Sequence, residues 1–204
     1  MRRVLASCLA ICPFVLPSVA VSADLAAQSV RVVGTVVPTA GGFGLASTTV
    51  QLQSSTIPLN TLTSQVSDLR GTVVPGTSPP LIDVTAATRS AAVFQLGGNP
   101  RLGHSLQLRV TDPASMWWYA FFSTAEGFMP LTGIVAQLDG TLLIDYSYTA
   151  TYDAGALTNG TWSGVLPVPN DPLLIGLPVR FQFATITANL GVLYINACMA
   201  VIQA

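Results

Sequence analysis

Val32–Pro38 (VVGTVVP) and Leu69–Pro75 (LRGTVVP) are two segments of one pattern, in which an apolar run ends in Gly-Thr-Val-Val-Pro. Valine and threonine favour β-strands. A glycine inside a strand marks a bulge or a sharp bend, which a small barrel needs in order to close. The two segments therefore predict two strands of one small β-barrel.

On either side of these two segments, apolar and polar residues alternate, and this pattern predicts a first module over residues 29–93. Its expected strands are Val30–Val37, Leu45–Gln53, Gln65–Val74 and Leu81–Thr88, with one short helical turn at Ile57–Leu62. The module resembles the small OB-like barrel modules of secreted proteins. OB folds often bind oligonucleotides or sugars. The strand Leu45–Gln53 lacks the aromatic and basic side chains of such binding faces, so a scaffold role is expected.

A second module is predicted over residues 97–204. Short runs of alternating apolar and polar residues are separated there by clusters of Gly, Pro, Asn and Asp, which is typical of an antiparallel β-sandwich. The expected strands are Ser105–Thr111, Met116–Ser123, Gln137–Leu138, Thr141–Tyr148, Thr161–Leu166, Val179–Ile186 and Val192–Ile202. The predicted fold class is all-β: a small OB-like β-barrel followed by an antiparallel β-sandwich.

The segment Gly164–Leu177 (GVLPVPNDPLLIGL) is the most specific motif of the second module. Together with Arg180–Ala184 (RFQFA) and Leu193–Ala197 (LYINA), it resembles the C-terminal β-sandwich domain of uncharacterised secreted proteins of planctomycete-like bacteria. Pro100–Gly103 resembles the start of that domain. No biochemical activity is attached to the family, so the resemblance implies a fold and an exported location and no chemistry.

Three prolines in this motif, Pro167, Pro169 and Pro172, exclude it from a central strand, because proline fixes φ and removes a backbone donor. Asn170-Asp171 can cap a following turn that has Pro172 at its first position. We expect a crossover between two sheets, with Leu173–Ile175 packed over it as a lid.

The first 23 residues have the features of a signal peptide: two arginines near the start, an apolar stretch over Val4–Val21, and the small-residue cleavage site Val21–Ala23. Pro13 and Pro17 interrupt the apolar stretch, which favours cleavage over a membrane anchor. The predicted location is secreted or cell envelope, with no transmembrane span after signal removal. Cleavage leaves Cys198 as the one cysteine, so no internal disulfide is expected.

Charge and composition limit the classes of partner. The eight basic residues are all arginines, there are nine acidic residues, and the net charge is -1. A nucleic-acid interface needs a basic surface to neutralise phosphates, so nucleic acid is excluded. The sequence does not identify the partner; polysaccharide and other cell-surface proteins are the candidates, and no cofactor is predicted.

Signatures of catalysis are missing. His104 is the one histidine and Glu126 the one glutamate, and no Gly-x-Ser-x-Gly motif occurs. A glycosidase needs two facing carboxylates, and nothing in the sequence fixes a partner for Glu126. Asp139-Gly140 and Asn170-Asp171 could hold calcium through oxygen ligands, but such pairs are also ordinary turn residues. No catalytic residue and no metal site is therefore predicted.

Trp117, Trp118 and Tyr119 are the candidate ligand-binding residues. In a strand, Trp117 and Tyr119 share one face and Trp118 points to the other. One face belongs to the core, and exposed aromatics on the other could stack on sugar rings or contact a partner protein. The leading hypothesis is an exported, non-catalytic structural or adhesive β-protein. The alternatives are a carbohydrate-binding module that uses these aromatics and a secreted hydrolase that uses Glu126 or His104.

Overall fold

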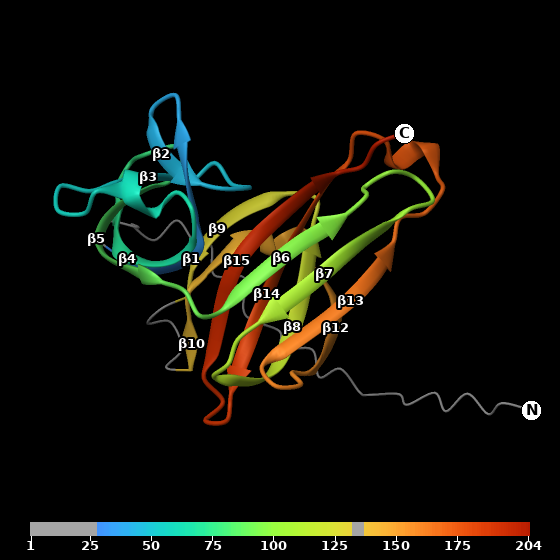
Figure 1. The fold of residues 1–204 in the computed structure, drawn as a ribbon. Coiled ribbons are helices and arrows are strands. Elements are labelled where there is room, and N and C mark those ends of the chain that lie inside the picture. Colours follow the sequence, from blue (N-terminus) through green and yellow to red (C-terminus); the bar gives the residue numbers. More distant parts are fainter. Residues whose placement is uncertain (1–27, 132–136) are drawn as a thin grey trace, which may run out of the picture.

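The computed structural model describes residues 28–131 and 137–204, and in these residues the chain is almost entirely β-structure (Figure 1). The predicted all-β fold class is confirmed. The predicted signal peptide, residues 1–23, lies outside the described residues. No helix in the described part is long and apolar enough to cross a membrane.

Five strands form a closed barrel in the order β1-β2-β3-β5-β4, with β4 returning to β1. Neighbours are antiparallel except β3 and β5, which are parallel. A short 3-10 turn, η1 (Leu59–Leu62), links β3 to β4 where a helical turn is predicted. The strands are β1 (Ser29–Thr39), β2 (Gly42–Leu45), β3 (Gln51–Gln53), β4 (Val66–Val74) and β5 (Leu81–Arg89). The arrangement is an OB-like, five-stranded Greek-key barrel.

The two repeated segments lie in β1 and β4, which pair with each other. Gly71 lies at a bulge between β4 and β5, as predicted. A Cβ on Gly71 would lie 2.1 Å from the carbonyl oxygen of Asp83, so only glycine allows the strands to approach this closely. The predicted strand Leu45–Gln53 is largely wrong: residues 46–50, which include Ser47 with φ 65°, form a turn between β2, which ends at Leu45, and β3 (Gln51–Gln53).

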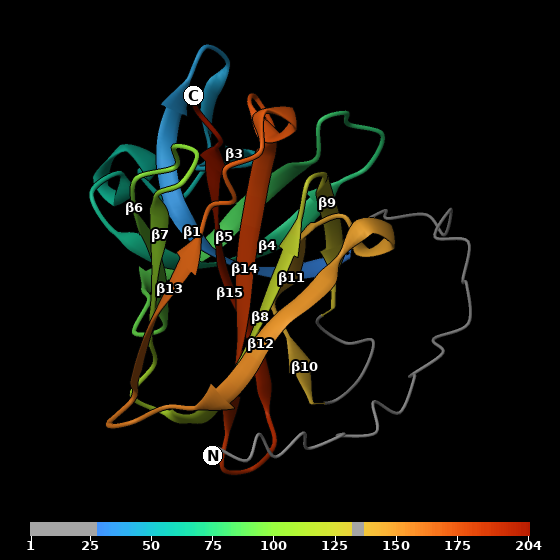
Figure 2. The same cartoon turned by 90° about the vertical axis from the view of Figure 1, so that its right-hand side faces the viewer.

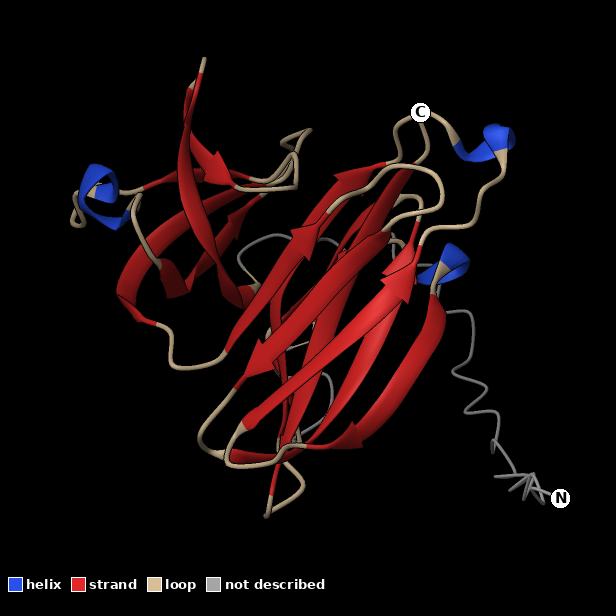
Figure 3. Cartoon of the chain, turned by 45° about the vertical axis from the view of Figure 1, so that its right-hand side comes forward, coloured by secondary structure: helices blue, strands red, loops and turns tan. Residues whose placement is uncertain are grey.

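The sandwich consists of a five-stranded sheet in the order β10-β15-β14-β8-β12 and a three-stranded sheet in the order β13-β7-β6 (Figure 3). Trp118, Phe94 and Phe183 are among the largest side chains buried between the sheets. The strands are β6 (Val93–Gly98), β7 (Ser105–Thr111), β8 (Ser115–Ser123), β10 (Leu138–Asp139), β12 (Ala150–Ala156), β13 (Thr161–Pro167), β14 (Pro178–Thr187) and β15 (Val192–Val201).

A separate two-stranded hairpin packs on the outer face of the five-stranded sheet. It consists of β9 (Glu126–Pro130) and β11 (Thr141–Ile144), and the short turn η2 (Tyr146–Tyr148) follows it. Three strands, β6, β9 and β12, lie outside the predicted strands, and β11 ends at Ile144, four residues before the predicted end at Tyr148. The sandwich also begins earlier than predicted, because β6 starts at Val93 and not at Gly97.

The two sheets are joined differently along the two sides of the sandwich. On one side the Asn196 side chain of β15 bonds to the backbone of β6: its Oδ1 accepts from Phe94 N at 2.8 Å, and its Nδ2 donates to Phe94 O at 2.7 Å. This amide substitutes for a pair of ladder hydrogen bonds between the sheets. On the opposite side β12 pairs with β8 and β13 with β7, and Figure 2 looks into the side between β12 and β13.

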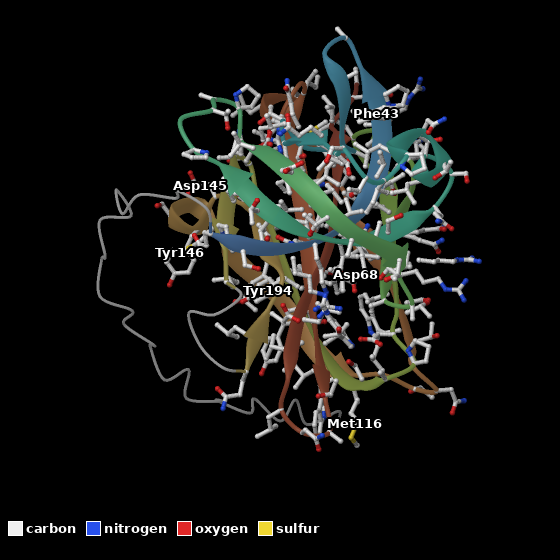
Figure 4. The ribbon with its side chains drawn as sticks, turned by 90° about the vertical axis from the view of Figure 1, so that its left-hand side faces the viewer. Phe43, Asp68, Met116, Asp145, Tyr146 and Tyr194 are labelled. Carbon is white, nitrogen blue, oxygen red and sulfur yellow. The ribbon has the colours of Figure 1, made fainter. Side chains whose placement is uncertain are left out.

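Arg31 of β1 joins the barrel to the sandwich. Its Nε and Nη2 donate to the Asp68 carboxylate at 2.9 and 2.6 Å, and its Nη1 donates to Asp139 of β10. The hydrogen bond to Asp68 raises the pKa of the guanidinium above its ordinary value, with Asp139 adding to the effect against desolvation. Asp68 lies where the barrel meets the sandwich in Figure 4. Leu143 of the β9–β11 hairpin and Ala197 of the sandwich also pack into the barrel core.

The proline-rich segment crosses from β13 to β14, and therefore from one sheet to the other, as predicted. Asp171 caps the turn η3 (Pro172–Leu174) by accepting from Leu173 N at 3.0 Å. The predicted lid is largely wrong. Only Leu174 packs on the core, whereas Leu173 is 89% exposed and Ile175 is also exposed. The turn is too short to direct three consecutive side chains inward.

Candidate functional site

Trp117 and Tyr119 of β8 point outward from the five-stranded sheet, and Trp118 points into the core. The exposed fractions are 41% for Trp117, 1% for Trp118 and 42% for Tyr119. The alternation therefore separates the three residues as predicted. Trp118, however, must be corrected from a candidate ligand-binding residue to a core residue, because a ligand could reach its ring only if the sheets separated.

The burial of Trp118 follows from its neighbours. Its ring centroid lies 4.0 Å from that of Trp162 on the opposite sheet and 5.5 Å from that of Phe183. Gly155 on the adjacent strand makes room for the ring, since a Cβ there would lie 3.2 Å from the indole atoms Cζ2 and Nε1. Among the described residues Nε1 has no hydrogen-bond partner, so the contribution of Trp118 is packing.

Trp117 and Tyr119 form what we call the aromatic strip. Cross-strand neighbours of Trp117 are Ala156 and Ile186, and Ala154 on β12 lies beside Tyr119. Small aliphatic neighbours leave the aromatic side chains accessible. The strip lines a shallow hollow of about 510 Å³, and none of the described residues that line it carries a charge.

Next to the aromatic strip, the β9–β11 hairpin covers the outer face of the five-stranded sheet. Phe121 and Tyr194 are stacked with ring centroids 6.0 Å apart, and they pack on the β9–β11 hairpin through residues such as Met129 and Ile144. Burial raises the pKa of the Tyr194 phenol, and the nearby Tyr146 adds to the effect. The hairpin therefore ends the accessible part of this face next to the aromatic strip.

The residues considered for catalysis lie in different places. His104 is exposed and ends the turn that starts at Arg101, whose carbonyl accepts from His104 N. The Glu126 carboxylate accepts from Thr49 Oγ1 at 2.9 Å and from Thr49 N, and it lies 3.8 Å from Arg180 Nη2. Glu126 therefore connects the hairpin to the barrel and to β14. The structure does not bring His104 and Glu126 into one site.

Asp112 is a buried acid that the sequence analysis did not single out. Its Oδ2 accepts from Ser115 Oγ at 2.7 Å and from Thr185 Oγ1 at 2.6 Å, and its Oδ1 accepts from Ala114 N at 3.0 Å. The spacing Asp-Pro-x-Ser over residues 112–115 is a signal for such a side-chain turn. These bonds use both oxygens, so Asp112 holds the start of β8 against β14.

A polar cleft of about 550 Å³ lies between barrel and sandwich and reaches from Arg31 to Asp112. Arg31 is bonded to Asp68 and Asp139. The cleft is therefore the groove that runs along the contact between the barrel and the sandwich. In residues 28–131 and 137–204 no group of three or more His, Cys, Asp or Glu side chains is placed to hold a metal ion. Asp139 and Asp171, considered above for calcium, hold Arg31 and a turn instead.

The chain matches none of the protein-family models against which it was scanned. A search of curated proteins gave no significant match.

Proposed function

We propose that this protein is an exported, non-catalytic adhesive protein that binds neutral polysaccharide through the aromatic strip. The observation that carries the proposal is the half-exposed pair Trp117 and Tyr119 on one face of β8, in a hollow without charged side chains. Export follows from the signal-like sequence at the N-terminus. A non-catalytic role agrees with the structural use of Glu126 and the separate, exposed position of His104.

Sugar chemistry suits this surface. A pyranose ring presents carbon-bound hydrogens on its faces, and these pack against aromatic rings, while the Tyr119 hydroxyl can bond to a sugar hydroxyl. Trp117 and Tyr119 are two residues apart on a strand, which places their Cα atoms about 6.7 Å apart. Two successive sugar rings of an extended polysaccharide can therefore contact Trp117 and Tyr119. An anionic polysaccharide would find no compensating cation in the lining of the hollow.

The expected energy of one contact follows from exposure. An aromatic side chain presents about 150–250 Å², and Trp117 retains 41% of its exposure. Burying the remaining 60–100 Å², roughly, at about 25 cal/mol per Å² contributes about 1.5–2.5 kcal/mol. Loss of the ring should therefore weaken binding about 10- to 70-fold.

The test is a depletion assay of the purified protein on a panel of insoluble neutral and charged polysaccharides. Trp117→Ala and Tyr119→Ala should each weaken binding to a neutral polysaccharide, and the double variant should abolish it. Tyr146→Ala is the matched control, because Tyr146 is exposed but lies in η2, outside the strip. If no polysaccharide binds, or if the double variant binds normally, the proposal is wrong and a structural role without a glycan partner takes its place.

A further inference from the structure

We infer that the sandwich holds a binding site for an unbranched alkyl chain, such as the tail of a fatty acid or a lipid, in a cavity distinct from the aromatic strip. The cavity has a volume of about 290 Å³, just below the range of roughly 300–1,000 Å³ that is typical of small-molecule sites. Natural cores leave few voids larger than a water molecule, so this space is room that the side chains of the fold have not filled.

The cavity is lined by strands of both sheets and by the crossover between β13 and β14. Figure 1 shows this crossover and the C-terminus at the same end of the sandwich. The three-stranded sheet contributes Leu106 and Leu166, and the five-stranded sheet contributes Phe122, Val179 and Phe181. Facing sheets pack about 10 Å apart, so the space between them takes a single layer of aliphatic groups. This geometry favours a narrow, flexible chain.

The chemistry of the lining excludes a polar ligand. Tyr152 is the one lining residue whose side chain has a polar atom. Two of the others, Pro167 and Pro169, have no backbone N–H. At the rim, both backbone groups of Val168 are already paired: its N donates to His104 O, and its carbonyl accepts from Gly103 N. A sugar or peptide placed here would lose its water hydrogen bonds without replacement, which costs several kcal/mol for each group.

Further backbone groups of the crossover are also paired. Leu174 N donates to Asp171 O, Leu177 N to Leu174 O, and Ile202 N to Leu177 O. The rim is therefore formed without a ligand. The 89% exposed side chain of Leu173 belongs to this crossover, so an apolar group stands in solvent next to the apolar cavity. This arrangement lets a bilayer as well as a free fatty acid present the chain to the site.

The test uses sodium decanoate as the probe, with isothermal calorimetry and thermal unfolding of the full chain. Decanoate should bind one per chain and, at 100 times its dissociation constant, raise the melting temperature by about 5–10 °C. Leu166→Phe fills the cavity and should weaken binding at least tenfold. Val165→Phe, on the exposed face of the same strand, is the matched control and should bind normally. Val179→Phe fills the cavity from the opposite sheet if Leu166→Phe fails to fold.

Two further experiments distinguish a bilayer lipid from a free fatty acid as the source of the alkyl chain, and the cavity from the aromatic strip. Cosedimentation with phosphatidylcholine vesicles that is reduced in Leu173→Ser identifies a bilayer source, and decanoate binding without cosedimentation identifies a free fatty acid. The Trp117→Ala/Tyr119→Ala variant should keep its decanoate binding whatever its behaviour on polysaccharide. The inference is overturned if decanoate does not bind, or if it binds equally to wild type and to both cavity-filling variants.

Discussion

Replacing Gln182 by leucine should destabilise the protein severely. Gln182 of β14 is completely buried, and its amide connects three segments of backbone. Its Oε1 accepts from Leu143 N at 2.8 Å, and its Nε2 donates to the carbonyls of Thr141 and Ile195, each at 2.8 Å. The amide therefore fixes β11 of the hairpin on β14 and β15. Leucine has a similar size but leaves all three groups without a partner.

The magnitude follows from the burial of these partners. Thr141, Leu143 and Ile195 are each at most 2% exposed, so water cannot replace the lost bonds. An unsatisfied buried group costs about 1–3 kcal/mol, and the gain in apolar surface offsets part of the sum. We expect a loss of about 3–6 kcal/mol, against a total stability of roughly 5–15 kcal/mol for a typical protein. The melting temperature should fall by about 6–24 °C.

The assay is urea unfolding followed by far-ultraviolet circular dichroism, with Gln107→Leu as the control. Gln107 lies exposed on β7, and its replacement should change the free energy of unfolding by less than about 0.5 kcal/mol. A Gln182→Leu variant within 1 kcal/mol, roughly, of wild type would refute the reasoning, because it would mean that the three backbone groups find other partners.

Two further predictions concern a glycine and a thiol. Gly71→Ala should cost about 1–3 kcal/mol in urea unfolding, because its Cβ would meet Asp83 O at 2.1 Å, whereas Gly97→Ala, with open space around it, should be neutral; equal effects of the two would contradict the bulge geometry. Burial raises the pKa of the Cys198 thiol to about 11, so the unfolded chain releases this proton first, and stability should fall as the pH rises from about 9 to 11. Between pH 8 and 9.5 the free energy of unfolding should fall by about 1 kcal/mol. Cys198→Ala should remove this fall. An unchanged pH dependence in that variant would show that another group causes it.

The sequence predicted strands best where they are apolar and alternate clearly. β7, β13, β14 and β15 lie within one or two residues of their predicted bounds. β12 (ATYDAGA) was missed because Asp153 and Gly155 are poor strand formers. It is a strand because it pairs with β8, more than twenty residues earlier in the chain, and Gly155 is required there by the ring of Trp118. Such a long-range requirement leaves no signal in the local pattern.

The candidate site shows the same limit. Alternation placed Trp117 and Tyr119 on one face of their strand and Trp118 on the other, but it could not say which face a second sheet would cover. The face that is covered depends on Trp162 of β13, which lies more than forty residues later in the sequence and packs on Trp118. The cavity was not predicted at all, because its lining comes from strands of both sheets and from the crossover. Ordinary core residues such as Leu166 look the same in sequence whether or not they surround a space.

The side of the sandwich between β12 and β13 also determines how the molecule should move. At one end, the bridge between Thr158 and Thr161 and the contact between the tilted rings of Trp118 and Trp162 hold the two sheets together. Toward the other end, Tyr152 and Leu166 border the cavity and are joined by no ladder. Thermal motion should therefore separate the sheets most near Tyr152 and Leu166, while the end with Trp118 and Trp162 stays together. Amide hydrogens near Tyr152 should exchange with solvent earlier than those of β14, and a ligand could enter without global unfolding.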